Sequence, residues 1–287
     1  MPIQPTSAGA DTDMTVSAQP LILVTNDDGI ESPGLAAAAA ALASFGELLI
    51  IAPLHQQTSR GRGRHERGST DSRILRRTIG YQGQSWEGYA VDATPAVAVD
   101  HGILVLADRP VSLAVSGINY GENVGSCVTV SGTVGAALEA ADYGIPAIAI
   151  SLELKEPDFY TLNSAIDFSA AVHFLRYFAE RTMKLDFPED VDVLKIEIPV
   201  SAGESTRWVV TQQDRIAYYH ADYADRKDFF TDPAELKLIT RKGEYGQDGT
   251  DAHALAQGWV SVTPLSLDLT SRVDLKELRR IISDDEL

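Results

Sequence analysis

The sequence has very little cysteine and is short of basic residues. Among its 287 residues Cys127 is the single cysteine, which excludes a disulfide framework and any cysteine-rich zinc site. Lysine and arginine number 24 against 41 aspartates and glutamates, so the net charge at pH 7 is −17. Because such a field repels polyanions, we expect no nucleic acid polymer and no anionic membrane among the partners.

Long apolar runs are missing as well. No run approaches the roughly 20 residues that span a bilayer, and residues 1–20 lack the basic start and apolar stretch of an export signal. We therefore expect a cytoplasmic protein. Residues 1–20 are rich in Pro, Ser, Thr, Ala and Asp, with little to bury, so we interpret them as a disordered N-terminal extension.

From residue 21 onward, short apolar strands alternate with helices. Buried strands are predicted at 21–25, 47–52, 111–115, 146–152 and 193–198, and a hairpin at 74–79 and 86–91. Helices are predicted at 35–44, 94–106, 131–143 and 163–183. This alternation predicts an α/β fold with a parallel core sheet over residues 21–200. We expect the sheet to end near residue 198, and residues 201–287 to form a C-terminal extension used in oligomerisation. Its clearest predicted strands are 207–211 and 259–263, and a charged terminal helix is predicted near 273–283.

Two adjacent acids, Asp27 and Asp28, directly follow the first strand. Ligands gather at the carboxyl ends of parallel strands, because loops converge there and the helices that follow point their positive N-termini at them. Two carboxylates this close repel each other unless a divalent cation holds both in the ionised form. The pair therefore suggests a metal site, although a solvated turn at Asp28-Gly29 fits these residues equally well.

Three more polar segments follow the predicted strands. The strand ending at Val115 runs into Ser-Gly-Ile-Asn-Tyr-Gly-Glu-Asn-Val-Gly, residues 116–125, and Ser131-Gly132-Thr133 begins the next helix. N–H groups and hydroxyls at such a helix start can hold phosphate oxygens, although Ser131 can also serve as an ordinary helix cap. Residues 54–70 form a basic loop, whose arginines either attract phosphate or stay solvated.

Together these segments resemble the SurE family of metal-dependent survival-protein nucleotidases. The resemblance runs from about Leu21 to Leu269 and rests on Asn26-Asp27-Asp28-Gly29, Ala52-Pro53 with Thr58-Ser59, Ser116-Gly117-Ile118-Asn119, Ser131-Gly132-Thr133, Gly249-Thr250-Asp251 and Gly258–Leu265. It implies a Rossmann-like three-layer α/β sandwich and one divalent metal cation per subunit. It also implies release of phosphate from nucleoside monophosphates, at the 5′ position with 3′ substrates still to be tested, and homodimers or homotetramers formed through the C-terminal elements.

The resemblance assigns roles to particular residues. Three of the family's metal-binding and catalytic positions match directly, at Asp27, Asp28 and Asn119. The family's hydroxyl ligand falls on Thr58, with Ser59 as the alternative, and phosphate binding falls on Ser131, Gly132 and Thr133. Asn123 either binds phosphate or supports its own turn, and the same choice applies to Asn26. Because all these ligands present oxygen, we expect Mg²⁺ or Mn²⁺ and a metal-activated water as the nucleophile.

Other functions compete with this interpretation. A receiver-type signalling domain also binds magnesium with acids after its first strand, but it needs a phosphorylatable Asp where this chain has Ser116–Asn119. A haloacid-dehalogenase-type phosphatase needs Asp-x-Asp, whereas these acids are adjacent. A non-catalytic metal- or nucleotide-binding module remains an alternative, which activity data would separate. Tyr218, Tyr219 and Tyr223 can stack on a base or fill an apolar interface.

Overall fold

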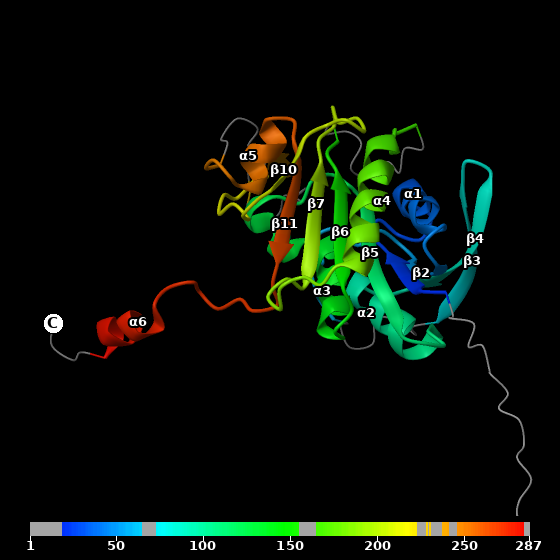
Figure 1. Ribbon diagram of the computed structural model, residues 1–287, viewed down its shortest axis with the longest axis horizontal. Helices are drawn as coiled ribbons and strands as arrows, with labels where there is room; N and C mark the ends of the chain where they lie inside the picture. Colours follow the sequence, from blue (N-terminus) through cyan, green and yellow to red (C-terminus); the bar gives the residue numbers. More distant parts are fainter. Residues whose placement is uncertain are drawn as a thin grey trace, which may run out of the picture.

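In the computed structural model, the chain forms a nine-stranded sheet with helices on both faces (Figure 1). The structure describes residues 19–64, 73–154, 165–222, 228, 230, 237–240 and 246–283. The extension expected at residues 1–20 lies almost wholly outside these residues, as do Tyr223 and residues 65–70 of the basic loop.

The strands of the main sheet follow the order β3-β4-β2-β1-β5-β6-β7-β11-β8. Their bounds are β1 Leu21–Thr25, β2 Glu47–Pro53, β3 Ile74–Tyr81, β4 Gln84–Val91, β5 Val111–Tyr120, β6 Ala147–Leu152, β7 Val193–Ile198, β8 Trp208–Val210 and β11 Val260–Leu265. From β4 to β7 every neighbouring pair is parallel, so six carboxyl ends meet at one edge. A separate antiparallel pair consists of β9 Tyr219–Asp222 and β10 Lys237–Thr240.

The helices form the two outer layers. They are α1 Pro33–Leu42, α2 Pro95–His101 with a π turn at Gly102–Leu106, a 3₁₀ helix at Gly125–Val130, α3 Gly132–Asp142, α4 Ser169–Lys184, α5 Asp251–Ala256 and α6 Leu275–Ile282. Side chains of α1 and α4 share one hydrophobic core with the sheet, and those of α2 and α3 share another on the opposite face. Of the helix predicted at 163–183, residues 163 and 164 lie outside the described residues, and the described helix begins at Ser169 with Phe168 at its N-cap position.

Burial of both sheet faces explains why the strands appear in the sequence as unbroken apolar runs. Along β1, Ile22 and Val24 enter the core shared with α1 and α4, whereas Leu21 and Leu23 enter the core shared with α2 and α3. The prediction of a Rossmann-like, mostly parallel α/β sandwich is confirmed. Among the described residues, the helices are too short or too polar for any of them to span a bilayer.

The sheet continues beyond residue 198, so the predicted end of the sheet is wrong. Strand β11 pairs antiparallel with β7, with Val262 opposite Ile196, and β8 then pairs parallel with β11. Strand β5 is also longer than predicted: after an irregularity between Ser116 and Asn119 it pairs with β6 up to Tyr120. The division of the chain near residue 200 stays a prediction, and α6 lies away from the sheet (Figure 1).

Candidate metal and phosphate site

Asp27 and Asp28 lie at the carboxyl edge of the parallel strands, directly after β1, and both are buried. Asn26 shapes their turn, because its side-chain amide donates to the carbonyl of Gly29 (3.1 Å) and accepts from the N–H of Gly29 (3.2 Å). Gly29 has φ +100°, a conformation that glycine adopts without strain. Of its two possible roles, Asn26 therefore performs turn support in this structure.

The carboxylate of Asp27 lies against the start of α3. Thr133 Oγ1 donates to Asp27 Oδ1 at 2.6 Å, and N–H groups of Gly132 and Thr133 also bind this carboxylate. Burial raises the pKa of Asp27 to about 6, while these hydrogen bonds act in the opposite direction. A Cβ at position 132 would lie 2.7 Å from Asp27 Cβ, so the close approach requires glycine there.

Asp28 is bound from two other segments. The N–H of Tyr120 donates to Asp28 Oδ2 (3.2 Å), and Gln56 Nε2 donates to Asp28 Oδ1 (3.3 Å). Burial, followed by the negative charge of Asp27, raises the pKa of Asp28 well above its ordinary value. In the part of the chain that the structure describes, neither acid pairs with lysine or arginine. Positive charge from a cation would therefore stabilise both carboxylates in their ionised form.

Asn119 lies next to Tyr120 at the end of β5 and so shares this edge with the acids. Its Nδ2 donates to the carbonyl of Gly121 at 2.7 Å, which leaves the amide carbonyl oxygen as the atom for a cation. The sequence-based prediction placed Asn119 in a loop. In the structure Asn119 belongs to β5, but the strand is irregular just before it, because Gly117 has φ +133° and lies close to Ile150.

Thr58 and Ser59 are exposed, in the loop that also carries Gln56. The N–H of Gln57 donates to the carbonyl of Asp27 at 2.7 Å, which brings this loop against the acid pair. Neither hydroxyl forms a described hydrogen bond to Asp27 or Asp28, so the choice of hydroxyl ligand stays a prediction. Gln56 had no sequence signal, because an isolated glutamine matches no ligand spacing.

Ser131 and Asn123 have other partners in this structure. Ser131 Oγ accepts the N–H of Val134 at 3.1 Å, the ordinary capping contact. Asn123 Nδ2 donates to Ser151 Oγ at 3.0 Å, and the Asn123 N–H donates to Glu197 Oε2 at 2.8 Å. The structure thus brings Asp27, Asp28, Asn119, Gly132 and Thr133 together, and it ties Asn123 to β6 and β7. Phosphate binding by Ser131 and Asn123 stays a prediction.

The described part of the basic loop is anchored to α3. Arg62 and Arg64 both form ion pairs with Glu139, a fully buried residue of α3. Gly61 also approaches α3 closely, because a Cβ at Gly135 would lie 2.4 Å from the Gly61 carbonyl carbon. These arginines therefore neutralise a buried acid, a contact that the arginine-glycine composition alone did not reveal.

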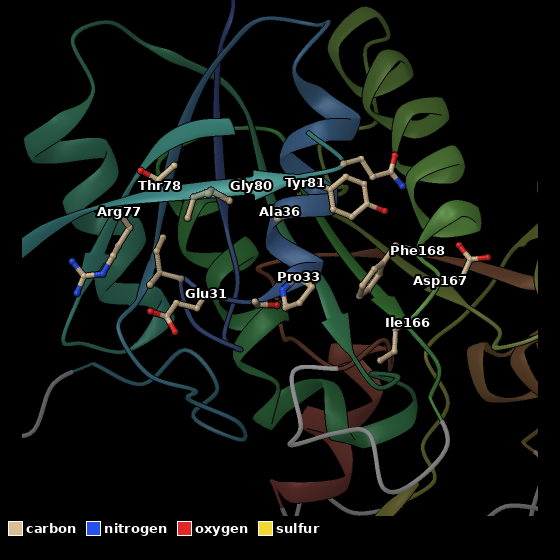
Figure 2. A pocket seen from close by; sticks show the side chains of 14 residues that line it. Glu31, Pro33, Ala36, Arg77, Thr78, Gly80, Tyr81, Ile166, Asp167 and Phe168 are labelled. Atoms are coloured by element: carbon tan, nitrogen blue, oxygen red, sulfur yellow. The ribbon is translucent and has the colours of Figure 1, made fainter. Parts of the chain in front are cut away.

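A cavity of about 610 Å³ lies beside the start of α1. Figure 2 shows Arg77 and Glu31 at one end of it and the rings of Tyr81 and Phe168 at the other. Its walls are the first turn of α1, the β3-β4 hairpin and residues 166–168. Asp27, Asp28 and Asn119 do not line this cavity, so it is distinct from the acid site.

The donor atoms at the acid site suit a hard cation. Two carboxylates, an amide oxygen and a nearby hydroxyl are the ligand types of Mg²⁺ or Mn²⁺. No group of three or more His, Cys, Asp or Glu side chains converges on one point among the described residues. Thr25 Oγ1 and Ser116 Oγ, on strand positions paired in register, are also buried without a described hydrogen-bond partner. The residues present therefore fit a divalent cation.

Fold and site together define an α/β protein with a candidate oxygen-donor site for a cation at the carboxyl edge of a Rossmann-like sheet. A family model described as "Survival protein SurE" matches residues 22–220. The chain therefore belongs to the SurE family, as the sequence motifs predicted.

Named relatives extend over almost the whole chain. The 5′-nucleotidase SurE of Thermococcus kodakarensis is 38% identical over 262 residues, which cover 91% of this chain and 98% of the relative. That of Archaeoglobus fulgidus is 40% identical over 257 residues, covering 88% and 94%. The crystal structure of the SurE protein from Aquifex aeolicus matches with a TM-score of 0.70 and 30% identity, covering 91% of this chain and 99% of that one.

Proposed function

We propose that this protein is a metal-dependent 5′-nucleotidase, which removes the phosphate from nucleoside monophosphates. The observation that carries the proposal is the pair of buried acids, Asp27 and Asp28, beside the start of α3 in a chain of the SurE family. Relatives that bear the name 5′-nucleotidase support the reaction and the 5′ preference. Family membership does not favour a receiver-like signalling domain, and the activity assay below separates catalysis from simple binding.

One divalent cation per subunit, Mg²⁺ or Mn²⁺, is assigned to Asp27, Asp28, Asn119 and the hydroxyl of Thr58 or Ser59. When bound, such a cation supplies neutralisation of phosphate charge and a water of lowered pKa. The chain's own residues prepare the site: Thr133 holds the Asp27 carboxylate in its ionised form, and Asn119 is oriented by Gly121. Ser131 and the N–H groups of the first turn of α3 are assigned to the phosphate oxygens, together with Asn123.

Assembly into homodimers or homotetramers is part of the proposal. Helix α6 is amphipathic, and its apolar residues Leu275, Leu278 and Ile282 are 59%, 41% and 73% exposed. Because apolar side chains at this spacing share one helix face, a second copy of the chain would bury them. The cytoplasmic location expected from the composition also stays a prediction.

The experiment measures phosphate released from a panel of 5′- and 3′-nucleoside monophosphates, first with EDTA and then with added Mg²⁺ or Mn²⁺. We expect metal-restored release that Asp28→Ala reduces by about a hundredfold or more. Asp186→Ala, which removes an exposed acid distant in sequence from the site, is the matched control. If folded protein releases no phosphate with either metal, the nucleotidase proposal fails and the binding-module alternative replaces it.

A further inference from the structure

A fully buried lysine and glutamate on β7 bind the segment that follows Asn119. Lys195 Nζ donates to the main-chain carbonyl of Asn123 at 2.9 Å, and Glu197 Oε2 accepts the main-chain N–H of Asn123 at 2.8 Å. Both side chains are 0% exposed. Two side chains of one strand thus occupy both main-chain polar groups of one residue in the loop after β5.

A short path of contacts leads from this residue back to Asn119. The side chain of Asn123 donates to Ser151 Oγ, and Ser151 is the register partner of Asn119 across β5 and β6. The N–H of Gly121 donates to the carbonyl of Leu152 at 2.9 Å, and the Gly121 carbonyl accepts Asn119 Nδ2. Because the Gly121 carbonyl orients the Asn119 amide, a shift of the segment 121–123 would turn that amide.

The far end of the segment is held by the same group of side chains. Asp251 Oδ2 accepts from Lys195 Nζ at 2.9 Å and from the N–H of Gly125 at 3.2 Å. Nearby, Tyr218 is buried and donates to Glu122 Oε1 at 2.7 Å, so its hydroxyl is hydrogen-bonded inside the protein. The segment 121–125 is therefore fixed by buried polar contacts along its length.

These contacts are costly, which argues for a specific role. Lys195 is buried near the carboxylates of Glu197 and Asp251, and removing charges from water is repaid only by well-formed polar contacts. Two residues earlier, the same face of β7 carries Val193, which packs in the core shared with α2 and α3. An apolar side chain at position 195 would fill that core but could not hold Asn123.

We propose that Lys195 and Glu197 are positioning residues for the cation site, which hold Asn123 by its main chain and thereby orient the Asn119 amide. The inference deepens the proposed function and rests on it, because it takes Asn119 as a metal ligand. Ser151 contributes to the same hold through the Asn123 side chain.

The test compares Mn²⁺ binding, measured by electron paramagnetic resonance on the full-length protein, with phosphate release and thermal unfolding. The main variant is Lys195→Met combined with Glu197→Leu, which removes both groups that bind the Asn123 main chain, keeps the local net charge and leaves Asp251 bound by the N–H groups of Gly125, Asp214 and Ala252. Ser151→Ala is a second variant that changes no charge. The matched control is Thr263→Val, a buried hydroxyl of β11 whose described contacts are with Thr211 and Ser261.

We expect the double variant to raise the Kd for Mn²⁺ by about tenfold or more and to lower kcat, because loss of groups that orient a ligand weakens metal binding to this extent. Ser151→Ala should weaken Mn²⁺ binding by about threefold in the same sense, and Thr263→Val should leave it unchanged. Folded variants with the wild-type Kd for Mn²⁺ overturn the inference, even if their melting temperatures fall, since that result indicates a structural role only.

The remaining outcomes decide between the positioning inference and the nucleotidase proposal. If the double variant does not fold, the Kd of Ser151→Ala alone confirms or overturns the inference. If the wild-type protein binds Mn²⁺ but releases no phosphate, the nucleotidase proposal fails while the comparison of Mn²⁺ affinities still tests the positioning. If the wild-type protein releases phosphate but Mn²⁺ binding does not depend on Asn119, as judged with Asn119→Ala, the positioning inference fails and the nucleotidase proposal stands.

Discussion

Replacing Thr133 by valine tests how Asp27 is kept ionised in the interior of the protein. Valine has the shape of threonine but removes the hydroxyl that donates to Asp27 Oδ1 at 2.6 Å. Burial raises the pKa of Asp27 from 3.8 to about 6. This shift corresponds to about 3 kcal/mol in the free energy of unfolding, by which protonated Asp27 stabilises the fold relative to ionised Asp27. Because the folded-state pKa is raised, this contribution is fully present below about pH 4 and is lost as the pH rises through about 6.

The hydroxyl of Thr133 limits that loss, because a hydrogen bond to a charged group is worth about 2 kcal/mol. Without it, the pKa of Asp27 in the folded protein rises further above its ordinary value. We therefore expect Thr133→Val to lower the free energy of unfolding by about 2 kcal/mol at about pH 8, where Asp27 is ionised. At about pH 5, where the folded state holds the proton, the loss should shrink to about 1 kcal/mol or less.

The assay is urea unfolding of metal-free protein in EDTA at both pH values. Thr133→Ser retains the hydroxyl and should behave like the wild-type protein. Thr182→Val removes another buried hydroxyl, which donates to the Phe178 carbonyl, so its effect should not depend on pH. A loss for Thr133→Val that is equal at both pH values would refute the assignment of this hydroxyl to the ionised form of Asp27.

Further predictions concern glycine, metal and assembly. Gly132→Ala should destabilise the protein and abolish Mn²⁺ binding, because the added Cβ would lie 2.7 Å from Asp27. Alanine ordinarily stabilises a helix by about 1 kcal/mol over glycine, so propensity alone predicts the opposite effect on stability. A thermal melt and a Mn²⁺ titration check both effects. Adding Mn²⁺ at about 100 times its Kd should stabilise metal-free protein by about 2.7 kcal/mol, and Asp28→Asn should lose this stabilisation; an unchanged shift in Asp28→Asn would remove Asp28 from the site. Deleting residues 272–287 should reduce the number of subunits per particle, determined from the molar mass in light scattering, while the remaining chain keeps its circular dichroism spectrum. An unchanged number of subunits would exclude α6 from assembly.

The alternation of apolar strands and helices predicted the core because each strand is buried on both faces. Helix starts were equally clear where a cap and a proline coincide, as at Thr94-Pro95, where Thr94 Oγ1 accepts the N–H of Val97. Ser32 precedes Pro33 in the same way, yet its hydroxyl makes no capping hydrogen bond. The position of a cap thus follows from sequence, whereas its hydrogen bond depends on the neighbours that fold around it.

Predictions failed where the stabilising partner is distant in sequence. A strand was predicted at 259–263, but its place in the core sheet was not. Strand β11 alternates between buried Val260 and Val262 and buried Ser261 and Thr263, so it lacked the continuous apolar run of a core strand. Its place beside β7 is decided by pairing across more than sixty positions of the chain. The role of Arg62 and Arg64 in the basic loop was ambiguous for the same reason, because they pair with Glu139 of α3.

The sequence by itself determined the α/β alternation, the family, and the candidate ligands Asp27, Asp28 and Asn119, because strand periodicity and short motifs are local properties of the chain. Only the tertiary structure decided what surrounds those ligands: Thr133 on Asp27, the Tyr120 N–H on Asp28, and the Lys195–Glu197 pair on Asn123. A buried lysine looks like any other lysine in a sequence. Its partners are chosen by how strands and loops meet in space, and no local pattern records that meeting.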